Sequence, residues 1–151
     1  MQVDMEMIVL SGIQCSGKST LYQQKFAETH VRINLDTLKS RRKEMALFSS
    51  LIEEQRMVVI DNTNPTMQDR AKYIGAAKQV NYRVVGIQLD VPISIAVARN
   101  LARINQAKIP DGIIQSTFRK MQPLSLSEGF DEIVNIRFSS HQRPEVTRIV
   151  K

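Results

Sequence analysis

The stretch of sequence that decides the fold of this chain is Gly12-Ile13-Gln14-Cys15-Ser16-Gly17-Lys18-Ser19. Its two glycines, with four residues between them and a lysine and a serine after the second, have the spacing of a P-loop. Glycine at these positions lets the backbone curl so that successive amide N–H groups face one concavity, and the helix that follows adds its positive N-terminal end. Such a loop binds phosphate anions before any side chain acts. We therefore expect the chain to bind a nucleoside triphosphate.

The segments on either side of the loop support this interpretation. An apolar run, residues 7–10, precedes it and a segment of helical character, residues 18–28, follows it, which is the context that a P-loop requires. In that context Lys18 lies along the β- and γ-phosphates and the Ser19 hydroxyl binds Mg²⁺. The predicted nucleotide-binding residues are Gly12, Ile13, Gln14, Cys15, Ser16, Gly17, Lys18, Ser19 and Thr20.

The length and composition are those of one soluble domain. The chain has 151 residues, of which 42% are hydrophobic and 24% charged, and we predict a single domain over residues 1–151. The first apolar run is too short, and too close to Asp4 and Glu6, for a signal peptide or a membrane span. The single cysteine excludes an internal disulfide. These features predict a cytoplasmic protein with no membrane partner.

The charge of the chain favours an anionic partner. Basic residues outnumber acidic ones by 21 to 15, which gives a net charge of +6. Between residues 92 and 122 the only acidic residue is Asp111, and the basic residues are Arg99, Arg103, Lys108, Arg119 and Lys120. This one stretch therefore contributes +4 of the net charge.

Apolar runs alternate along the chain with segments of helical spacing, the pattern of a parallel sheet with crossover helices. The runs are residues 7–10, 57–60, 84–89 and 133–138, with a weaker one at 31–35. The helical segments are residues 18–28, 36–56 as one or two helices, 66–80, 93–103 and 111–122. The helix at 66–80 is expected to bury a stripe made of Met67, Ala71, Ile74 and Ala77.

These elements predict an α/β fold of the P-loop kinase type. We expect a five-stranded parallel sheet in the order 2-3-1-4-5, with helices on both faces and the site at the carboxyl ends of the strands. A small helical lid is expected at about residues 99–111. Residues 139–151 are expected to form a frayed, flexible tail, although Val146, Ile149 and Val150 would also suit an edge strand.

Asp61 is the candidate metal ligand that accompanies Ser19. It follows the apolar run 57–60, the position from which an acidic residue of a P-loop enzyme reaches Mg²⁺ directly or through water. The expected strand order places this run beside the P-loop strand, as a shared metal contact requires. Residues 61–65, Asp-Asn-Thr-Asn-Pro, also have the composition of a tight turn, so a turn alone is the other interpretation.

The motifs of this chain, taken in order, resemble the kinase domain of polynucleotide 5′-hydroxyl kinases. The resemblance extends over roughly residues 7–138, and apart from the P-loop its strength lies in the order and spacing of the motifs. The motifs are residues 12–19, Asn34-Leu35-Asp36-Thr37-Leu38-Lys39, Asp61-Asn62-Thr63-Asn64-Pro65, Arg99-Asn100-Leu101-Ala102-Arg103, and Ile109-Pro110 with Phe118 and Met121.

The resemblance implies a reaction in which the ATP γ-phosphate is transferred, with Mg²⁺, to the 5′-hydroxyl of RNA or DNA. Asp36 takes the place of the general base of the family, because an attacking alcohol has to lose its proton. Arg99 and Arg103 match lid arginines that neutralise the phosphoryl oxygens during transfer, and their spacing of four places them on one helix face. With Lys18, these three residues make up the predicted catalytic set.

The resemblance also implies where the acceptor binds. Lys39 stands where the family usually has an arginine that contacts the nearest acceptor phosphate, and lysine keeps the charge but not the two-pronged geometry. Asn62, Thr63 and Asn64 match the segment beside the acceptor. The basic residues at 39–43 extend this expectation to an acceptor groove, or else form a solvated helix face balanced by glutamates such as Glu44.

Other interpretations stay open at this level. Asp36 is also a common kind of helix cap, and the two lid arginines could form an exposed ion-pair face. Aromatic residues make up only 5% of the chain, with no tryptophan, so platforms on which bases stack are scarce. A kinase for a small alcohol, such as a sugar acid, an antibiotic or a nucleotide-like metabolite, is therefore the second hypothesis, and an ATP-binding accessory protein without turnover is the third. The sequence leaves the oligomeric state undetermined.

Overall fold

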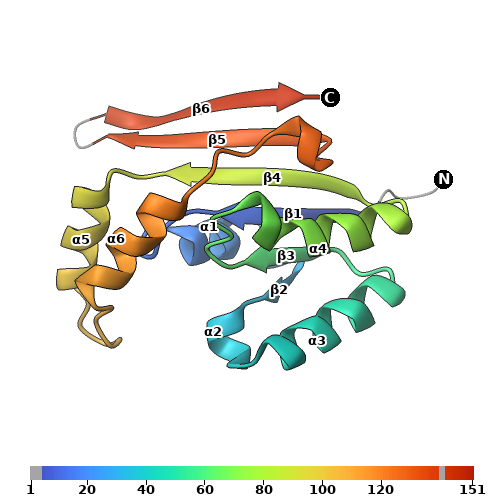
Figure 1. The fold of residues 1–151 in the computed structure, drawn as a ribbon, viewed down its shortest axis with the longest axis horizontal. Coiled ribbons are helices and arrows are strands. Elements are labelled where there is room, and N and C mark those ends of the chain that lie inside the picture. Colours follow the sequence, from blue (N-terminus) through green and yellow to red (C-terminus); the bar gives the residue numbers. More distant parts are fainter. Residues whose placement is uncertain (1–4, 140–141) are drawn as a thin grey trace.

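The computed structural model describes residues 5–139 and 142–151, which form one twisted sheet of six strands in the order β2-β3-β1-β4-β5-β6 with helices around it (Figure 1). The strands are β1 (Glu6–Ser11), β2 (Val31–Ile33), β3 (Val58–Asp61), β4 (Arg83–Asp90), β5 (Glu132–Ser139) and β6 (Gln142–Val150). The helices are α1 (Lys18–Lys25), α2 (Leu35–Leu38), α3 (Arg41–Glu53), α4 (Met67–Gln79), α5 (Ile93–Leu101) and α6 (Asp111–Lys120), with a short 3₁₀ helix η1 (Leu126–Glu128).

The central strand β1 is buried on both faces, which is why its sequence is an unbroken apolar run. Met7 and Val9 belong to one core cluster and Ile8 and Leu10 to another, as the alternation of side chains along a strand requires. Parallel pairing with β3 sets Leu10 opposite Asp61. The end of the P-loop strand therefore lies beside the acidic end of its neighbour.

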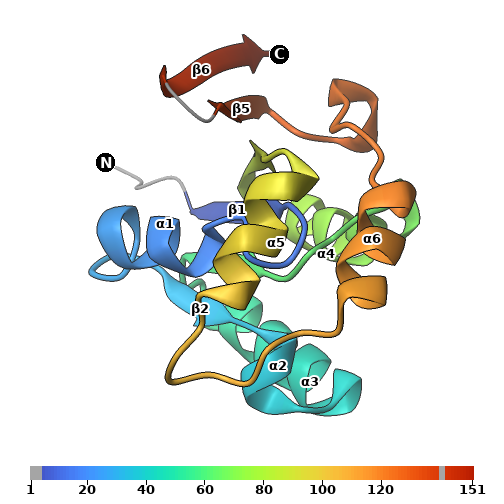
Figure 2. The same cartoon turned by 90° about the vertical axis from the view of Figure 1, so that its left-hand side faces the viewer.

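Helices cover both faces of the sheet (Figure 2). Tyr22 of α1 packs in the cluster that contains Ile8 and Leu10, whereas α3 and α4 pack against the opposite face. Helix α4 begins with a capping box, in which Thr66 and Asp69 exchange side-chain to backbone hydrogen bonds. Its buried residues are Arg70, Tyr73, Ile74 and Ala77, so the expected stripe is confirmed at Ile74 and Ala77 and wrong at Met67 and Ala71, which are exposed.

The predicted order of the five parallel strands is confirmed, and the sheet has one strand more. Strand β6 pairs antiparallel with β5, with Val146 opposite Ile136 and Ile149 opposite Ile133, so the expectation of a frayed tail is wrong over residues 142–150. Residues 140–141 lie outside the described part. The sequence of β6 lacks an apolar run because this strand exposes its side chains, and its pairing depends on the backbone ladder that the edge of β5 offers.

Helices α5 and α6, which border the predicted lid segment, lie at the carboxyl end of the parallel strands, beside the P-loop end of β1 (Figure 1). A small cluster of buried side chains, among them Ile13, Ala96 and Ile114, joins both helices to the P-loop. Helix α5 ends at Leu101, two residues earlier than expected, and an irregular segment leads to α6. Among the described residues, none of the helices has the length and apolarity needed to traverse a bilayer.

Candidate active site

The P-loop between β1 and α1 has the curled backbone expected of it. Cys15 and Gly17 have φ angles of 63° and 100°, in the left-handed region that favours glycine at the second position. A Cβ on Gly12 would lie 2.7 Å from the Ser16 Oγ and 3.2 Å from the carbonyl oxygen of Leu89. A side chain at residue 12 would therefore clash with Ser16 and crowd the backbone of β4.

Lys18 begins α1, and its ammonium group bends back over the loop. Its Nζ donates to the carbonyl oxygens of Gly12 at 2.9 Å and Ile13 at 2.8 Å. Desolvation lowers the pKa of Lys18 to about 8, against the opposing pull of the negative charge on Asp61 and Asp36. A phosphate group bound in the loop would favour the protonated form of Lys18 and so raise its pKa again.

Ser19 and Asp61 lie together, as their predicted role as metal ligands requires. The Ser19 Oγ donates to the Asp61 Oδ2 at 3.3 Å, and Asp61 is almost completely buried at the end of β3. The guanidinium of Arg32, on β2, donates to both oxygens, at 2.6 Å to Asp61 Oδ2 and 2.8 Å to Ser19 Oγ. Hydroxyl and carboxylate oxygens are ligands that Mg²⁺ accepts, and the bound guanidinium shows that this pair favours a cation. The donor set therefore fits a magnesium ion.

Asp36 lies in the first turn of α2, and Asn34 caps that helix in its place. The Asn34 Oδ1 accepts from the backbone N–H of Thr37 at 3.0 Å, and the Nδ2 donates to the carbonyl oxygen of Asp61 at 2.5 Å. Within the described ranges no hydrogen bond or ion pair engages the Asp36 carboxylate, and the residue is exposed at the wall of a cavity. The carboxylate is therefore available to an incoming group.

The Asn62 side chain is engaged at both ends by protein groups. Its Oδ1 accepts from the backbone N–H of Leu35 at 2.8 Å, and its Nδ2 donates at 2.8 Å to Glu44, a fully buried carboxylate on α3. Glu44 also accepts from Arg41 at 3.0 Å and from the Tyr73 hydroxyl, and burial with this contact raises the pKa of Tyr73. Glu44 is thus an interior anchor for the turn that carries Asp36, and not one of the charges of a solvated helix face.

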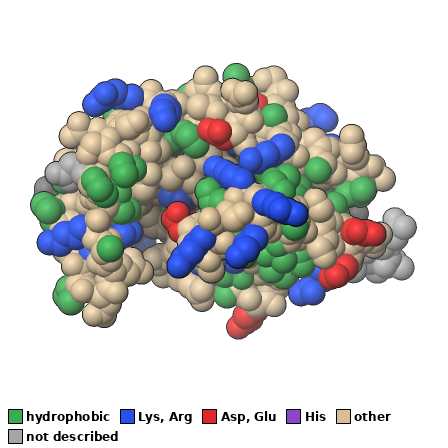
Figure 3. All heavy atoms as spheres, turned by 60° about the horizontal axis from the view of Figure 1, so that its bottom comes forward, with side chains coloured by type: hydrophobic (Ala, Val, Ile, Leu, Met, Phe, Trp, Pro, Cys, Tyr) green, Lys and Arg blue, Asp and Glu red, His purple; other side chains and the backbone are tan. Residues whose placement is uncertain are grey.

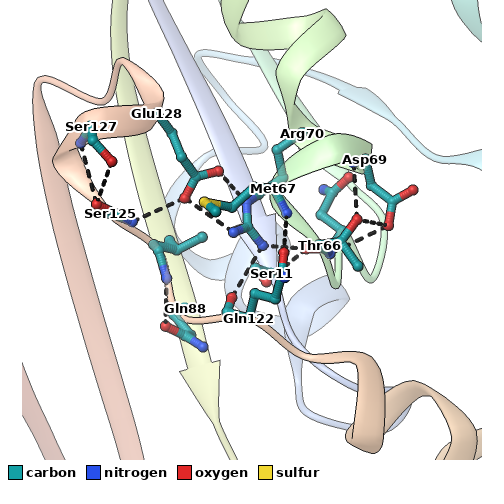
Figure 4. Close-up of polar contacts among 12 residues, drawn as sticks. Ser11, Thr66, Met67, Asp69, Arg70, Gln88, Gln122, Ser125, Ser127 and Glu128 are labelled. Carbon is teal, nitrogen blue, oxygen red and sulfur yellow. Dashed lines mark hydrogen bonds and ion pairs between the residues drawn. The ribbon is translucent and has the colours of Figure 1, made fainter.

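Arg70 holds the far end of the β3–α4 loop in place (Figure 4). The arginine is fully buried on α4 and forms a two-pronged ion pair with Glu128 of η1, at 2.8 and 3.0 Å. Its remaining amino group donates to the carbonyl oxygens of Asn64 at 2.8 Å and Gln122 at 3.3 Å. One side chain therefore connects this loop to the segment that leaves the lid. Asn64 itself is buried, with its Nδ2 on the Leu10 carbonyl oxygen at 2.7 Å.

The two lid arginines reach the site from different parts of the lid. Arg99, on α5, donates to the Cys15 carbonyl oxygen at 3.1 Å and lies 5.7 Å from the centre of the Phe138 ring. Arg103 lies beyond the end of α5 and donates to the Ala107 carbonyl oxygen at 3.2 Å. The two residues do not share a helix face, because the helix ends between them, but both line the same cavity. From there each guanidinium can meet the oxygens of a phosphate in the cavity.

These groups surround a cavity of about 1050 Å³ at the carboxyl end of the sheet. The predicted site residues that line it are Gln14, Cys15, Ser16, Gly17, Lys18, Ser19, Thr20, Asp36, Asp61, Asn62, Thr63, Arg99 and Arg103. Those that do not line it are Gly12, Ile13, Lys39 and Asn64. Lys39 is exposed just after α2, with a φ of 63°. The cavity thus brings together Asp36, Lys18 and the predicted metal ligands Ser19 and Asp61.

A basic surface lies next to the α2 side of this cavity. Arg41, Arg42 and Lys43 are exposed in the first turn of α3, and Lys39 precedes them. In the view that brings the lower part of Figure 1 forward, lysine and arginine side chains gather across the middle of the face (Figure 3). Acidic side chains are scattered over the same face, near its middle as well as at its rim (Figure 3). A phosphate backbone that entered the cavity from this side would meet positive charge.

The residues that support the site loops and side chains through hydrogen bonds and ion pairs are not predicted from the sequence. Arg32 lies in β2, the strand with the least distinct apolar run. Nothing in the sequence around it indicates that it contacts Ser19 and Asp61, the predicted metal ligands. The pattern around Glu44 suggests a surface charge, and the expected stripe of the helix at 66–80 leaves out Arg70. Arg70 stands three and four residues before the apolar Tyr73 and Ile74. This spacing places its side chain on the buried face of the helix and is the signal that the sequence offers.

Comparisons with known proteins decide the family. A family model described as an AAA domain matches residues 7–124. The chain belongs to this family. The resemblance to polynucleotide kinases that the motifs indicate is also confirmed, because the bifunctional polynucleotide phosphatase/kinase of Schizosaccharomyces pombe is 31% identical over 137 residues. That match covers 88% of this chain and 34% of the relative, so the chain spans about a third of its length.

The chain is also similar to a second sequence relative and to a solved structure. The L-seryl-tRNA(Sec) kinase of Methanococcus maripaludis is 26% identical over 133 residues, which cover 76% of this chain and 51% of that protein. The crystal structure of a fungal RNA kinase superposes with a TM-score of 0.69 at 15% identity, over 92% of this chain and 40% of that one, and so shares the fold. The AAA domain described here thus has the fold of a P-loop kinase domain.

Proposed function

We propose that this chain transfers the γ-phosphate of ATP to the 5′-hydroxyl of a polynucleotide, RNA or DNA. The observation that carries the proposal is that Asp36, Lys18 and Asp61 line one cavity, with the Asp36 carboxylate free of protein contacts in the described part of the chain. The relative from Schizosaccharomyces pombe supports the choice of acceptor, since its name gives polynucleotide kinase as one of its two activities. We further propose that the described residues act as one kinase domain with a lid at about residues 99–111, in the cytoplasm.

Each catalytic group has a separate task in the proposed reaction. Asp36 accepts the proton of the acceptor hydroxyl as its oxygen bonds to the γ-phosphorus, while the bond from that phosphorus to the β–γ bridging oxygen breaks and ADP leaves. Lys18 and the P-loop amides hold the β- and γ-phosphates. Arg99 and Arg103 neutralise the equatorial oxygens as their charge changes. A magnesium ion held by Ser19 and Asp61 would supply further neutralisation of the phosphates.

The arrangement of charge supports a polyanionic acceptor. Asp36 lines the cavity from α2, and the exposed cations Lys39, Arg42 and Lys43 follow at the end of α2 and the start of α3, where the next phosphates of an acceptor end could meet them. Nonspecific affinity for nucleic acid comes largely from such lysine and arginine contacts with phosphates.

A second candidate acceptor is an alcohol group carried on a larger molecule, such as the hydroxyl of a seryl group. The match to an L-seryl-tRNA(Sec) kinase favours it, since that name describes a kinase for a seryl group carried on RNA. The same base, lysine and lid arginines would serve either alcohol, because the chemistry at phosphorus is identical.

An acceptor competition separates the two candidates. The protein is incubated with γ-labelled ATP, Mg²⁺ and an equimolar mixture of a 5′-hydroxyl oligonucleotide, the same oligonucleotide with a 5′-phosphate, a seryl-tRNA and a panel of small alcohols. The proposal predicts label on the 5′-hydroxyl oligonucleotide and none on its phosphorylated twin. Label on the seryl-tRNA or on a small alcohol alone would reverse the order of the candidates.

A further inference from the structure

Arg32 contacts the two predicted metal ligands, Ser19 and Asp61, from the cavity side. The proposed reaction gives Arg32 no role. Its Nε lies 2.6 Å from Asp61 Oδ2, and its second guanidinium nitrogen lies 2.8 Å from Ser19 Oγ. The side chain is 30% exposed and lines the cavity, whereas that of Asp61 is 1% exposed. The guanidinium therefore spans the same two oxygens that would hold the metal.

A metal ion and this guanidinium cannot occupy the pair together. Magnesium binds its oxygen ligands at about 2.0–2.1 Å with near-octahedral geometry. A planar cation already within hydrogen-bond distance of both oxygens fills that space and repels a second positive charge. Asp61, for its part, needs a cation in the absence of metal, because an unpaired buried carboxylate is costly.

We propose that Arg32 is an internal counter-ion that occupies the metal position of the kinase and has to leave it when Mg²⁺ enters with the nucleotide. The competition multiplies the apparent association constant for the metal by the fraction of molecules in which the ion pair is open. Because Arg32 is exposed toward the cavity, it has room to turn away without unfolding β2. This inference rests on the proposed metal role of Ser19 and Asp61, and not on the identity of the acceptor.

Binding of Mn²⁺ to the nucleotide-free protein, measured by the loss of the free-ion signal in electron paramagnetic resonance, tests the inference without any phosphate transfer. Arg32→Met is expected to bind Mn²⁺ about tenfold more tightly than the wild type if the ion pair is closed in about nine molecules of ten. Arg83→Met is the matched control. It removes one arginine that pairs with a carboxylate, Glu132 at 2.8 Å, at the start of β4 and so at the opposite end of the sheet, and should leave the affinity unchanged.

Asp61→Asn separates the failure of this inference from the failure of the metal assignment. Weaker Mn²⁺ binding in Asp61→Asn with unchanged or weaker binding in Arg32→Met would overturn the role of Arg32 and leave the metal site standing. Unchanged binding in Asp61→Asn would overturn both. If Arg32→Met does not fold, the Nε–H resonance of Arg32 in the wild type replaces it as the readout. That resonance should shift when Mg²⁺ and ADP are added together, and a hydrogen-bonded Nε–H that stays unchanged would contradict the proposal.

Discussion

The Asn34 side chain binds the main chain of Asp61, with 2.5 Å between its Nδ2 and the Asp61 carbonyl oxygen. Asn34 also caps the helix that carries Asp36, through its Oδ1. One asparagine therefore fixes the turn of the proposed base against the strand end that carries the proposed metal ligand. The two Asn34 contacts therefore set the position of the proposed base relative to the proposed metal ligand.

Replacing Asp36 with asparagine should abolish most of the transfer and leave nucleotide binding intact. The amide cannot take the proton of the acceptor, and general-base catalysis typically contributes about 10²–10⁴-fold to a rate. We expect kcat to fall by a factor in that range, with ATP affinity from calorimetry within about twofold of the wild type. Glu53→Gln, an equal change of charge on the exposed end of α3, is the control. A fully active Asp36→Asn enzyme would remove Asp36 as the base.

Lys18 should take up a proton when ATP binds at alkaline pH. The free protein holds this lysine with a pKa of about 8, so near pH 9 most molecules have it neutral. Bound phosphates favour the charged form, which raises the pKa and draws in about one proton. ATP affinity should therefore fall as the pH rises above 8.

Calorimetry in buffers of different ionisation enthalpy measures this proton directly. At pH 9 the observed binding enthalpy should vary with the buffer, with a slope of about one proton taken up for each ATP bound. The variant Lys18→Arg keeps its charge at that pH and should have a slope near zero. A wild-type slope equally near zero would mean that the lysine is already charged before ATP arrives.

Breaking the ion pair between Arg70 and Glu128 should destabilise the fold strongly. Both side chains are buried, so Arg70→Met leaves an unpaired carboxylate and is expected to lower the free energy of unfolding by about 3–5 kcal/mol. The double variant Arg70→Met with Glu128→Leu should recover much of this loss. Arg148→Gln, which breaks an exposed pair with Glu132, should change the stability by less than about 1 kcal/mol. Denaturant unfolding of these variants beside the wild type gives the values, and equal effects at the two sites would contradict the buried role.

Charge removal on the basic surface should weaken acceptor binding more than nucleotide binding. The pair Arg42→Gln and Lys43→Gln is expected to raise the KM for a 5′-hydroxyl oligonucleotide and to reduce the salt slope of its binding by about 0.7 for each phosphate that no longer meets a cation. Arg137→Gln with Arg148→Gln removes the same charge from β5 and β6, across the sheet from α3. Identical salt slopes for the two double variants would place the acceptor elsewhere.

The parallel part of the fold could be predicted from sequence because its strands are buried on both faces, so that their apolar runs stand out from the helices between them. Strand β6 could be suggested only as the alternative to a frayed tail, from Val146, Ile149 and Val150, since an exposed edge strand has no continuous apolar run. Its position depends on the free edge of β5, and that edge is a property of the assembled sheet.

The candidate site divides in the same way. Lys18, Ser19 and Asp61 follow from local motifs, because each lies at a fixed place relative to a strand end. Arg32 and Glu44 act through partners 29 and 18 residues away, so their roles depend on which strands and helices the fold brings together. Contacts of this kind cannot be inferred from the spacing of residues along the chain.

The most direct test of the central claim follows the γ-phosphate itself. The protein is incubated with γ-labelled ATP and a 5′-hydroxyl oligonucleotide, and the oligonucleotide is then digested to nucleoside 5′-monophosphates while ADP is counted. We predict that the label is found on the 5′-terminal nucleotide, with one ADP formed for each phosphate transferred. ATP turnover with an unlabelled oligonucleotide, or label at any position other than the 5′ oxygen, would contradict the account.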